Sequence, residues 1–457
     1  MSTEAMNHSS QRKAEASTLF PIPQPQTPQS AAPAPTGRPR VKRANRHQVA
    51  MRTVALDALL PEDHQARLVW EYVEGLELGR LYEPIRAVEG HAGRDAIDPK
   101  ILMALWLYAT LDGVGAARQL DRLCRDHVAY QWICGGVSVN YHTLSDFRTG
   151  HPALLDDLLT QSVATLMHEE LVTLHRVAQD GMRVRASAGA ASFRRRKTLE
   201  QCQEEAEEQV EALQKDLDAD PGGSSKRQQA SRRRAARERS ERIRRALEEL
   251  EDVESKKKAA EKDKARASTT DPEARVMKMG DGGFRPAHNV QFATDTESQV
   301  ITGVDVVNTG SDQGQMSPMV EQHQDRYDKV PDEVLVDGGF AKHEDIEKVS
   351  SPEPGMKVYA PVPKPKKHDR DPHEPMGGDS EVIAEWRRRM GTAEAKEIYK
   401  ERASTAECVN AIARNRGLRQ FLVRGLAKVR AVVLWFALAH NLMRAAALRA
   451  EAMATAG

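Results

Sequence analysis

The sequence is poor in cysteine and in aromatic residues, and its apolar runs are short. The four cysteines of the 457 residues are scattered, which gives no disulfide framework and favours a reducing compartment. Its longest apolar run, AVVLWFALA, is too short to span a bilayer, and the N-terminus lacks the apolar core of a signal peptide. We therefore expect a soluble, intracellular protein.

The cysteines raise one possible metal centre, a zinc site. Two cysteines and two histidines lie near one another in the sequence: Cys124, His127, Cys134 and His142. Zinc motifs have paired, short ligand spacings on both sides, and these are absent here. The spacing therefore disfavours zinc.

A net charge of one sign is also lacking, because 67 basic residues balance 67 acidic ones. The balance conceals a basic N-terminal arm, in which only Glu4 and Glu15 oppose Arg12, Lys13, Arg38, Arg40, Lys42, Arg43, Arg46 and Arg52. Such an arm is usually a solvated tail and sometimes neutralises phosphates. The arm is also rich in Pro, Ala and Gln, so we expect residues 1–58 to be disordered, and Arg38, Arg40, Lys42 and Arg43 are candidates for phosphate contacts.

The length of the chain exceeds one hydrophobic core and predicts two or three domains with insertions. Residues 59–170 read as a helical N-terminal domain. Its clearest helix starts in DPKILMALWLYATLDG, where Asp98 is a good N-cap, Pro99 suits the first helical position and Gly113 follows the last turn. Short helices packed at angles are consistent with DNA binding, and a purely structural bundle explains the pattern about as well.

A charged insertion, residues 198–268, follows a strand that the stretch LVTLHRVAQDGMRVRASAG predicts through Asp180. Apolar residues at heptad-like spacing predict two helical arms, with DADPGGSS between them. Acidic residues crowd the first arm, and the second arm begins with Arg232, Arg233, Arg234, Arg237 and Arg239. We expect a coiled-coil-like hairpin whose arms offset each other's charge, while surplus arginines remain able to contact phosphate.

Strand and helix patterns alternate beyond the insertion. HNVQFATD and QVITGVDVVNT predict two strands, SDQGQMSPMVEQHQDRY a helix, LVD and GMKVYAPVP two further strands, and helices follow from Ser380. Without the hairpin the order is strand, strand, strand, helix, strand, helix, strand, helix, which predicts a mixed α/β sheet. We assign residues 171–197 and 269–445 to this domain and residues 446–457 to a C-terminal tail.

The stretch PDEVLVDGGFAKHEDIE raises a functional question, because Asp337 follows directly on the apolar residues Val334, Leu335 and Val336. Asp-Gly is ordinary turn chemistry, in which the glycine takes the left-handed conformation. Functional groups also gather at the carboxyl ends of buried strands. One carboxylate does not hold a divalent metal, so a metal site needs partners elsewhere in the chain.

The order of elements, with an acid on the first strand and another at the end of the fourth, resembles the ribonuclease H-like core of DDE transposases. The resemblance is to bacterial insertion-sequence transposases of the eleven-eighty-two-like group, which is related to the insertion-sequence four and five superfamily. The matching segments are QDGMRVRASAG, DPEARVMKMGDGGFRPAHNVQ, LVDGGFAKHEDI and YKERASTAECVNAIARNRGLRQFLVRGLAKVRAVVLWFALAHNLMR. The helical segment 60–151 also looks like the N-terminal domain of these transposases.

The resemblance implies a metal-binding catalytic triad of Asp180, Asp337 and Glu407, holding two Mg²⁺ or Mn²⁺ ions for in-line phosphodiester substitution. The family's Tyr, Arg, Glu, Lys signature is similar to Tyr399, Arg402, Glu407 and Arg414, with one extra residue before the glutamate and Arg in place of Lys. On an ideal helix Arg414 shares the face of Glu407, whereas Arg402 lies roughly 140° away. By itself, STAE also fits a capping box that starts a helix at Ser404, and Glu397 and Glu401 read as solvated helix surface.

The leading hypothesis is a transposase that binds terminal inverted repeats, cuts there and joins the ends to target DNA. A metal-dependent nuclease or resolvase on the same core, and a non-catalytic DNA-binding scaffold, are the alternatives. Synapsis of two DNA ends leads us to expect a homodimer. The resemblance implies a bacterial cytoplasmic protein, associated with the nucleoid and not with a membrane.

Overall fold

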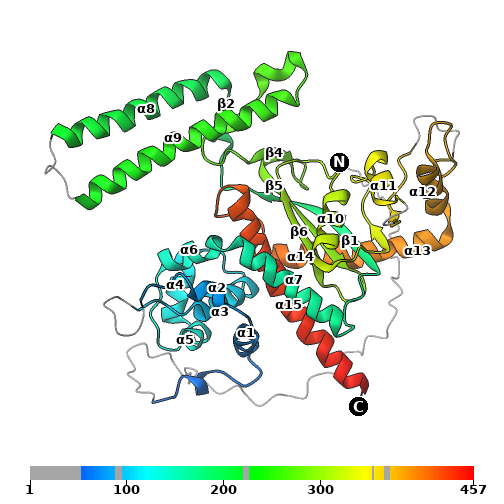
Figure 1. Cartoon of the computed structure of the whole chain (residues 1–457), viewed down its shortest axis with the longest axis horizontal. Coiled ribbons are helices and arrows are strands. Elements are labelled where there is room, and N and C mark those ends of the chain that lie inside the picture. Colours follow the sequence, from blue (N-terminus) through cyan, green and yellow to red (C-terminus); the bar gives the residue numbers. More distant parts are fainter. Residues whose placement is uncertain (1–52, 88–94, 220–225, 352–354, 365–370, 457) are drawn as a thin grey trace, which may run out of the picture. The chain divides into compact units, whose positions relative to one another are not determined.

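The computed structural model describes residues 53–87, 95–219, 226–351, 355–364 and 371–456 (Figure 1). The basic arm predicted for residues 1–58 lies outside the described residues up to residue 52, and so do Arg38, Arg40, Lys42 and Arg43.

Short helices make up the first part of the described chain, as the sequence predicted. After the 3₁₀ turn η1 (Asp57–Leu59) they are α1 (Gln65–Glu74), α2 (Gly79–Tyr82), α3 (Pro99–Leu111), α4 (Ala117–Asp126), α5 (Val128–Cys134), α6 (Tyr141–Gly150) and α7 (Pro152–His168). The predicted start of α3 is confirmed, because the Asp98 carboxylate accepts a hydrogen bond from the backbone N–H of Lys100 and Pro99 is the first helical residue. Gly113, just beyond the helix, has a φ of +73°.

A mixed sheet follows the helices, and its strands include those that the sequence predicted. They are β1 (Arg176–Arg185), β4 (Arg275–Lys278), β5 (Phe284–Asp295), β6 (Ile301–Val307), β7 (Glu333–Leu335) and β8 (Lys357–Tyr359). The order is β4-β5-β1-β7-β8, with β6 also paired to β5. β5 is antiparallel to β1, β4 and β6, whereas β1, β7 and β8 are parallel. The sequence pattern did not reveal β4, which is a short strand at the edge of the sheet.

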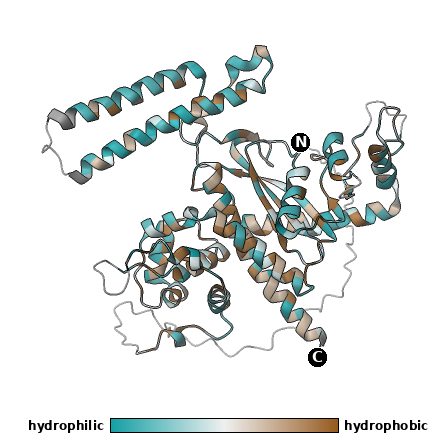
Figure 2. Cartoon of the chain, in the orientation of Figure 1, coloured by the Kyte–Doolittle hydropathy of each residue, from teal (hydrophilic) through white to brown (hydrophobic). Residues whose placement is uncertain are grey.

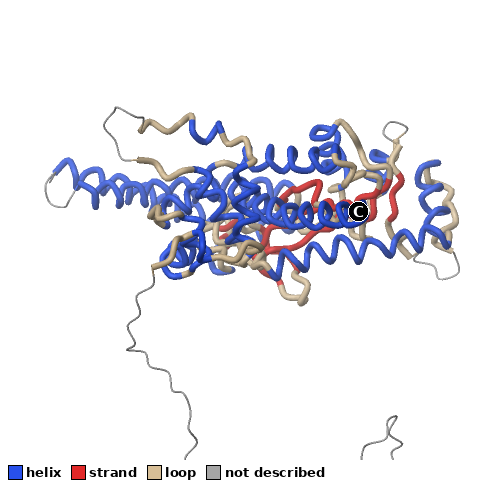
Figure 3. The backbone as a smooth tube through the Cα atoms, turned by 90° about the horizontal axis from the view of Figure 1, so that it is seen from below, coloured by secondary structure: helices blue, strands red, loops and turns tan. Residues whose placement is uncertain are grey.

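Helices lie to both sides of the strands in Figure 3. They are α10 (Met316–Tyr327), α11 (His343–Val349), α12 (Glu381–Gly391), α13 (Ala393–Arg402), the π-helical turn η4 (Ala403–Glu407), α14 (Cys408–Asn415) and α15 (Leu426–Ala456). Two hydrophobic clusters bury these elements. The larger combines the N-terminal helices with β1, β5, β6, α14 and α15, and the smaller combines β7 and β8 with α10 to α13.

The apolar stretch near the C-terminus is longer than the sequence reading suggested. Helix α15 continues to Ala456, through the position where a separate tail was expected, and its segment Leu426–Thr455 is long and apolar enough to cross a membrane. Of its most apolar window, 67% is buried inside the protein. α15 contacts α3, α6, α7 and β6, and Figure 2 shows its hydrophobic residues where it passes them. Its apolar composition is therefore explained by its position as a core helix.

The insertion forms two long antiparallel helices, α8 (Arg196–Ala219) and α9 (Lys226–Ser255), which are mostly hydrophilic in Figure 2. Helix η3 (Ala259–Lys264) follows them, and the short strands β2 (Phe193–Arg194) and β3 (Ala267–Ser268) pair to close the base. A separate apolar cluster, which includes Leu199, Ala246 and Leu250, holds the arms together.

Charge pairing between the arms is sparser than the sequence suggested. Of the arginines that begin the second arm, Arg239 alone among the described residues forms an ion pair with the first arm, at 3.8 Å from Glu205. At the base of the hairpin the polarity is reversed, because Arg196 of α8 pairs with Glu254 of α9 at 2.7 Å. Apolar contacts therefore contribute more to the hairpin than the predicted ion pairs do.

We expect the hairpin to be dispensable for folding, because its apolar cluster is separate from those that bury the sheet. Replacing residues 198–264 by a short Gly/Ser linker retains the β2–β3 pair and removes only a few contacts to the sheet, such as the Arg275–Glu249 ion pair. The loss in unfolding free energy should be about 1–2 kcal/mol, measured by urea denaturation. Loss of a cooperative transition in the shortened chain would show that the core depends on the hairpin.

Candidate active site

The parallel pairing of β1 and β7 brings the first two predicted acids together. Ala178 is the register partner of Leu335. Asp180 lies two residues after Ala178, and Asp337 lies two residues after Leu335. Side chains two residues apart on a strand point to the same face, so both carboxylates lie on one face at adjacent positions. The first two acids that the resemblance implied therefore lie side by side on one face of the sheet.

Asp337 has a structural partner as well as a position in the site. Its Oδ1 accepts a hydrogen bond of 2.7 Å from the backbone N–H of Gly339, so the turn predicted for Asp-Gly-Gly is present. Neither Gly338 nor Gly339 has a positive φ, however, which corrects the expected left-handed conformation. Gly339 is needed for a different reason: a Cβ there would lie 2.8 Å from Asp337 Oδ1. The other carboxylate oxygen, Oδ2, lies 4.0 Å from Arg402 Nη2.

The third predicted acid, Glu407, ends the π-helical turn η4 within an otherwise continuous helix. In a π-helix, hydrogen bonds run from residue i to i+5, so one turn holds one residue more than an α-helical turn. Arg402 and Glu407, which are five residues apart, therefore meet on one face, and Arg402 Nη1 donates to Glu407 Oε1 at 3.0 Å. The separation of roughly 140° expected for an ideal helix was wrong. The turn also accommodates the extra residue that distinguishes this sequence from the family signature.

The Arg402 guanidinium contacts all three predicted acids. Its Nη2 donates to Asp180 Oδ1 at 3.1 Å and lies 4.0 Å from Asp337 Oδ2, while Nη1 bonds Glu407. The Arg402 side chain is 11% exposed, whereas that of Glu407 is 60% exposed. The carboxylates of two strands and one helix thus surround a single cationic group.

Asp180 is the most enclosed of the three acids. Burial raises the pKa of its carboxyl, Arg402 opposes that shift, and the negative charge of Asp337 adds to it. Asn410, which is buried on α14, donates from Nδ2 to Asp180 Oδ2 at 2.8 Å. Sequence reasoning missed Asn410, because an Asn inside an amphipathic helix gives no pattern that points to a strand distant in the sequence.

A divalent cation fits the chemistry of these donors. Oxygens of Asp180, Asp337 and Glu407 all point at one positive group, and carboxylate oxygens are the ligands that Mg²⁺ and Mn²⁺ prefer. Asp180 is buried next to the carboxylate of Asp337, so a positive charge at this position stabilises its ionised form. Arg402 lies between the acids in this structure. Among the described residues, no three His, Cys, Asp or Glu side chains are close enough together to bind a metal ion as they stand.

A second polar network supports β1 from behind. Asp312 is buried and accepts hydrogen bonds from Arg183 at 2.7 Å, Asn289 at 2.7 Å and Gln291 at 2.8 Å. It lies against Gly181, where a Cβ would come within 2.1 Å of Asp312 Oδ1. Since Gly181 follows Asp180, the network fixes the strand from the face opposite to that of the acid. The one signal for this network in the sequence was the alternation of the polar residues Asn289 and Gln291 within a predicted strand. Both residues are buried in the structure.

Replacing Asp312 by Asn should destabilise the protein by about 2–4 kcal/mol, because it leaves the Arg183 charge without its partner and presents an NH₂ group to two amide donors. The free energy of unfolding in urea would measure this. As a control, Asp325→Asn on the exposed side of α10 should change it by less than about 0.5 kcal/mol. Equal effects of the two substitutions would contradict the supporting role.

The remaining predicted site residues lie in different surroundings. Tyr399 is partly buried against the smaller core, and burial raises the pKa of its hydroxyl. Arg414 is exposed, and no ion pair within the described chain ties it to the acids. Ser404 starts no helix, because α13, η4 and α14 are continuous, and its hydroxyl donates to the Glu401 carbonyl instead. The capping-box interpretation of STAE was therefore wrong.

The two neighbouring glutamates also differ from each other. Glu397 is a solvated residue, as predicted, and pairs with Lys400 at 2.7 Å. Glu401 was wrongly read as solvated surface, since both of its carboxylate oxygens accept from Arg176 Nη1 at 2.8 Å. Arg176 begins β1 and also pairs with Glu333 of β7. Glu401 thus ties α13 to the start of the strands that carry the acids.

The cysteines and histidines of the helical region form no metal centre among the described residues. Cys124 is partly buried next to the buried Cys134, and this neighbour together with burial raises the pKa of the Cys124 thiol.

Two family models match the chain. A transposase domain (DUF772) matches residues 54–150, and a transposase DDE domain matches residues 377–446. The first covers α1 to α6, and the second covers Tyr399, Arg402 and Glu407, while the strands with Asp180 and Asp337 lie between them. No curated protein and no solved structure matches. The two matches do not resolve the group within the family, but together they identify the chain as a member of the insertion-sequence DDE transposases.

Proposed function

We propose that this transposase binds the terminal inverted repeats of its own element, cleaves at the element ends and joins the 3′-hydroxyls to target DNA by two-metal phosphodiester substitution. One observation carries the proposal: Asp180, Asp337 and Glu407, from three separate elements, all point at one cationic group. A ribonuclease H-like fold is part of the proposal. The strand order supports it, since β1 is central, β5 pairs antiparallel with β1, β6 pairs antiparallel with β5, and β7 and β8 run parallel to β1.

The acids would hold two Mg²⁺ or Mn²⁺ ions, which activate the attacking oxygen and stabilise the leaving oxygen. Asp180 is the central ligand in this assignment, and Asn410 fixes its orientation through Oδ2. Arg402 balances the three negative charges and then offers its N–H groups to phosphate oxygens. Tyr399 and Arg414 belong to the DNA-contacting surface in this proposal, with the arginines and lysine of the basic arm.

The partners in this proposal are DNA and a second copy of the chain. Terminal repeats and target DNA supply the phosphodiester bonds, and a homodimer brings two ends together. The protein would therefore act in the bacterial cytoplasm, at the nucleoid, where these DNA substrates are found. The family resemblance supports this setting.

A strand-transfer assay separates this function from its alternatives. Purified protein with a labelled terminal-repeat duplex, a supercoiled target and Mg²⁺ should give joined products. A nuclease or resolvase on the same core would yield nicks without joined ends. Binding that is indifferent to metal and followed by no cleavage would favour a non-catalytic scaffold.

A further inference from the structure

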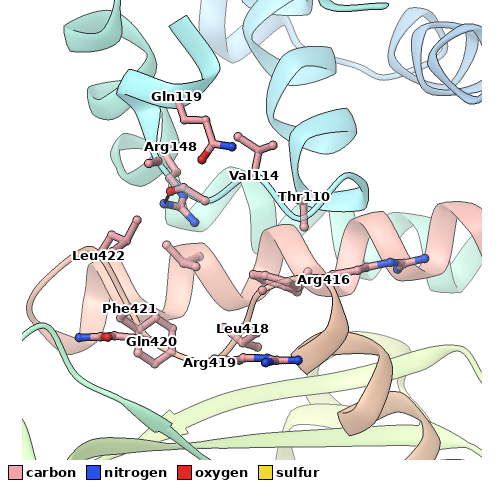
Figure 4. Close-up of a pocket in the computed structure, with 15 residues that line it drawn as sticks. Thr110, Val114, Gln119, Arg148, Arg416, Leu418, Arg419, Gln420, Phe421 and Leu422 are labelled. Carbon is pink, nitrogen blue, oxygen red and sulfur yellow. Dashed lines mark hydrogen bonds between the residues drawn. The ribbon is translucent and has the colours of Figure 1, made fainter. Parts of the chain in front are cut away.

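A cavity separate from the acidic site lies where the N-terminal helices meet the loop between α14 and α15 (Figure 4). Its volume is about 250 Å³, below the range of roughly 300–1,000 Å³ typical of pockets for drug-sized ligands. The polar side chains of its lining are Thr110, Gln119, Arg148, Arg416, Arg419 and Gln420. Three of these are arginines, and no Asp or Glu of the described chain lines the cavity.

Arg148, on α6, is the most deeply buried of these arginines, at 8% exposed. Its guanidinium carbon lies 4.7 Å from the centre of the Trp106 ring, and its Nη1 donates to the Gly115 carbonyl. Its Nε is buried without a hydrogen-bond partner, and no carboxylate of the described chain pairs with the side chain. Burial lowers the pKa of Arg148 to about 10, so the side chain is still charged at neutral pH. Figure 4 shows Arg148 and Gln119 pointing into the space above the loop.

Arg416 also lines this cavity, but its guanidinium points away from Arg148 in Figure 4. Its Nη1 is also buried without a partner, and it forms no ion pair with a described residue. Buried cations are normally paired, because removing a charge from water costs several kcal/mol unless an anion or hydrogen bonds compensate. A buried, unpaired arginine beside an acid-free cavity therefore indicates that the compensating anion comes from outside the chain.

We propose that this cavity binds a phosphate group, held by Arg148 with Gln119 as an additional donor. The DNA backbone is the source that the position favours, and in this respect the inference rests on the proposed function. The Phe421 N–H donates to the Arg185 carbonyl at 2.8 Å, so the loop is attached to the end of β1. Arg185 is five residues beyond Asp180 on that strand, about 17 Å away at a rise of roughly 3.3 Å per residue. DNA with its scissile bond at the acids would thus reach the cavity within a few nucleotides.

The test uses Gln119→Glu, because Gln119 is exposed and the substitution changes the charge of the cavity with almost no change in shape. The matched control is Gln161→Glu, an exposed position on α7 away from the cavity. Full-length proteins are titrated in EDTA with duplexes of the inverted repeat that flanks the gene, each with one backbone linkage replaced by a neutral methylphosphonate. Without divalent metal no chemistry occurs, so this readout is independent of cleavage and joining.

For the wild type and Gln161→Glu, one linkage near the cleavage site should weaken binding roughly tenfold when neutralised. Gln119→Glu should bind the unmodified duplex roughly tenfold more weakly, be insensitive at that linkage and have a salt slope smaller by about 0.9. In a second arm, inorganic phosphate is compared with chloride at equal ionic strength in thermal unfolding. Stabilisation by phosphate that Gln119→Glu alone loses, with no sensitive linkage in the DNA, would support the site with free phosphate as its source.

Identical behaviour of Gln119→Glu and Gln161→Glu in both arms would overturn the proposal. Failure of strand transfer would not, because neither arm needs metal or chemistry. Conversely, a chain that joins DNA ends but is indifferent to the charge of this cavity would retain the proposed function without the phosphate site.

Discussion

Glu407→Gln should abolish Mg²⁺-dependent cleavage and joining while binding of the terminal repeats survives. Gln keeps the shape of the side chain and removes the charge of a metal ligand. A missing ligand costs several kcal/mol of transition-state stabilisation, which corresponds to a loss of roughly a thousandfold or more in rate. Because Glu407 is 60% exposed, the folded state should tolerate the change. Cleavage and strand transfer, together with duplex binding in EDTA, would measure both halves of this expectation.

Two nearby glutamates provide controls for this substitution. Glu397→Gln removes only an exposed pair with Lys400 and should leave the cleavage rate unchanged. Glu401→Gln should also remain active, but it weakens the contact with Arg176 and should lower the unfolding free energy by about 1 kcal/mol. A Glu407→Gln protein that cleaves at the wild-type rate, or a folded Glu401→Gln protein that does not cleave, would mean that Glu407 is not the third acid.

Sequence patterns predicted the strands of this site well, because each signal was local. The apolar run before Asp337 indicated a buried strand, and the β-branched residues around Asp180 indicated another. The alternation of strands and helices then predicted their meeting in one mixed sheet. Asp337 was singled out by its place after the apolar run and Asp180 by the family resemblance, and the parallel register brings the two together.

The helix side of the site could not be predicted in the same way. The position of Arg402 depends on one π-helical turn, and propensities that describe α-helices contain no signal for it. Asn410 and Asp312 contact residues more than a hundred and twenty positions away, so only the folded chain identifies their partners. Glu401 has the composition of a solvated surface residue and yet holds Arg176, because packing of α13 on the strands decides its role.

The π-helical turn itself leads to a further expected result: deletion of Ser404 should preserve the site. Ser404 is exposed, and the turn η4 holds one residue more than an α-helical turn requires. Removing it should convert η4 into α-helix while the register of the flanking helices is kept. Arg402 and the glutamate would then be four residues apart, a spacing that also places them on one face. Mg²⁺-dependent cleavage should stay within roughly tenfold of the wild type, the range that corresponds to about 1.4 kcal/mol.

Deletion of Ala411 is the matched control, since Ala411 is also small and exposed but lies in the regular helix α14. No extra residue is available there to absorb the loss, so everything beyond it rotates by about 100° relative to the preceding helix. The buried residues Ala413 and Leu418 would leave the core, and we expect loss of cooperative unfolding and of all cleavage. If the Ser404 deletion folds but does not cleave, the π-helical turn has a role in the site beyond accommodating one residue. If both deletions cleave normally, the helix does not set the position of the third acid.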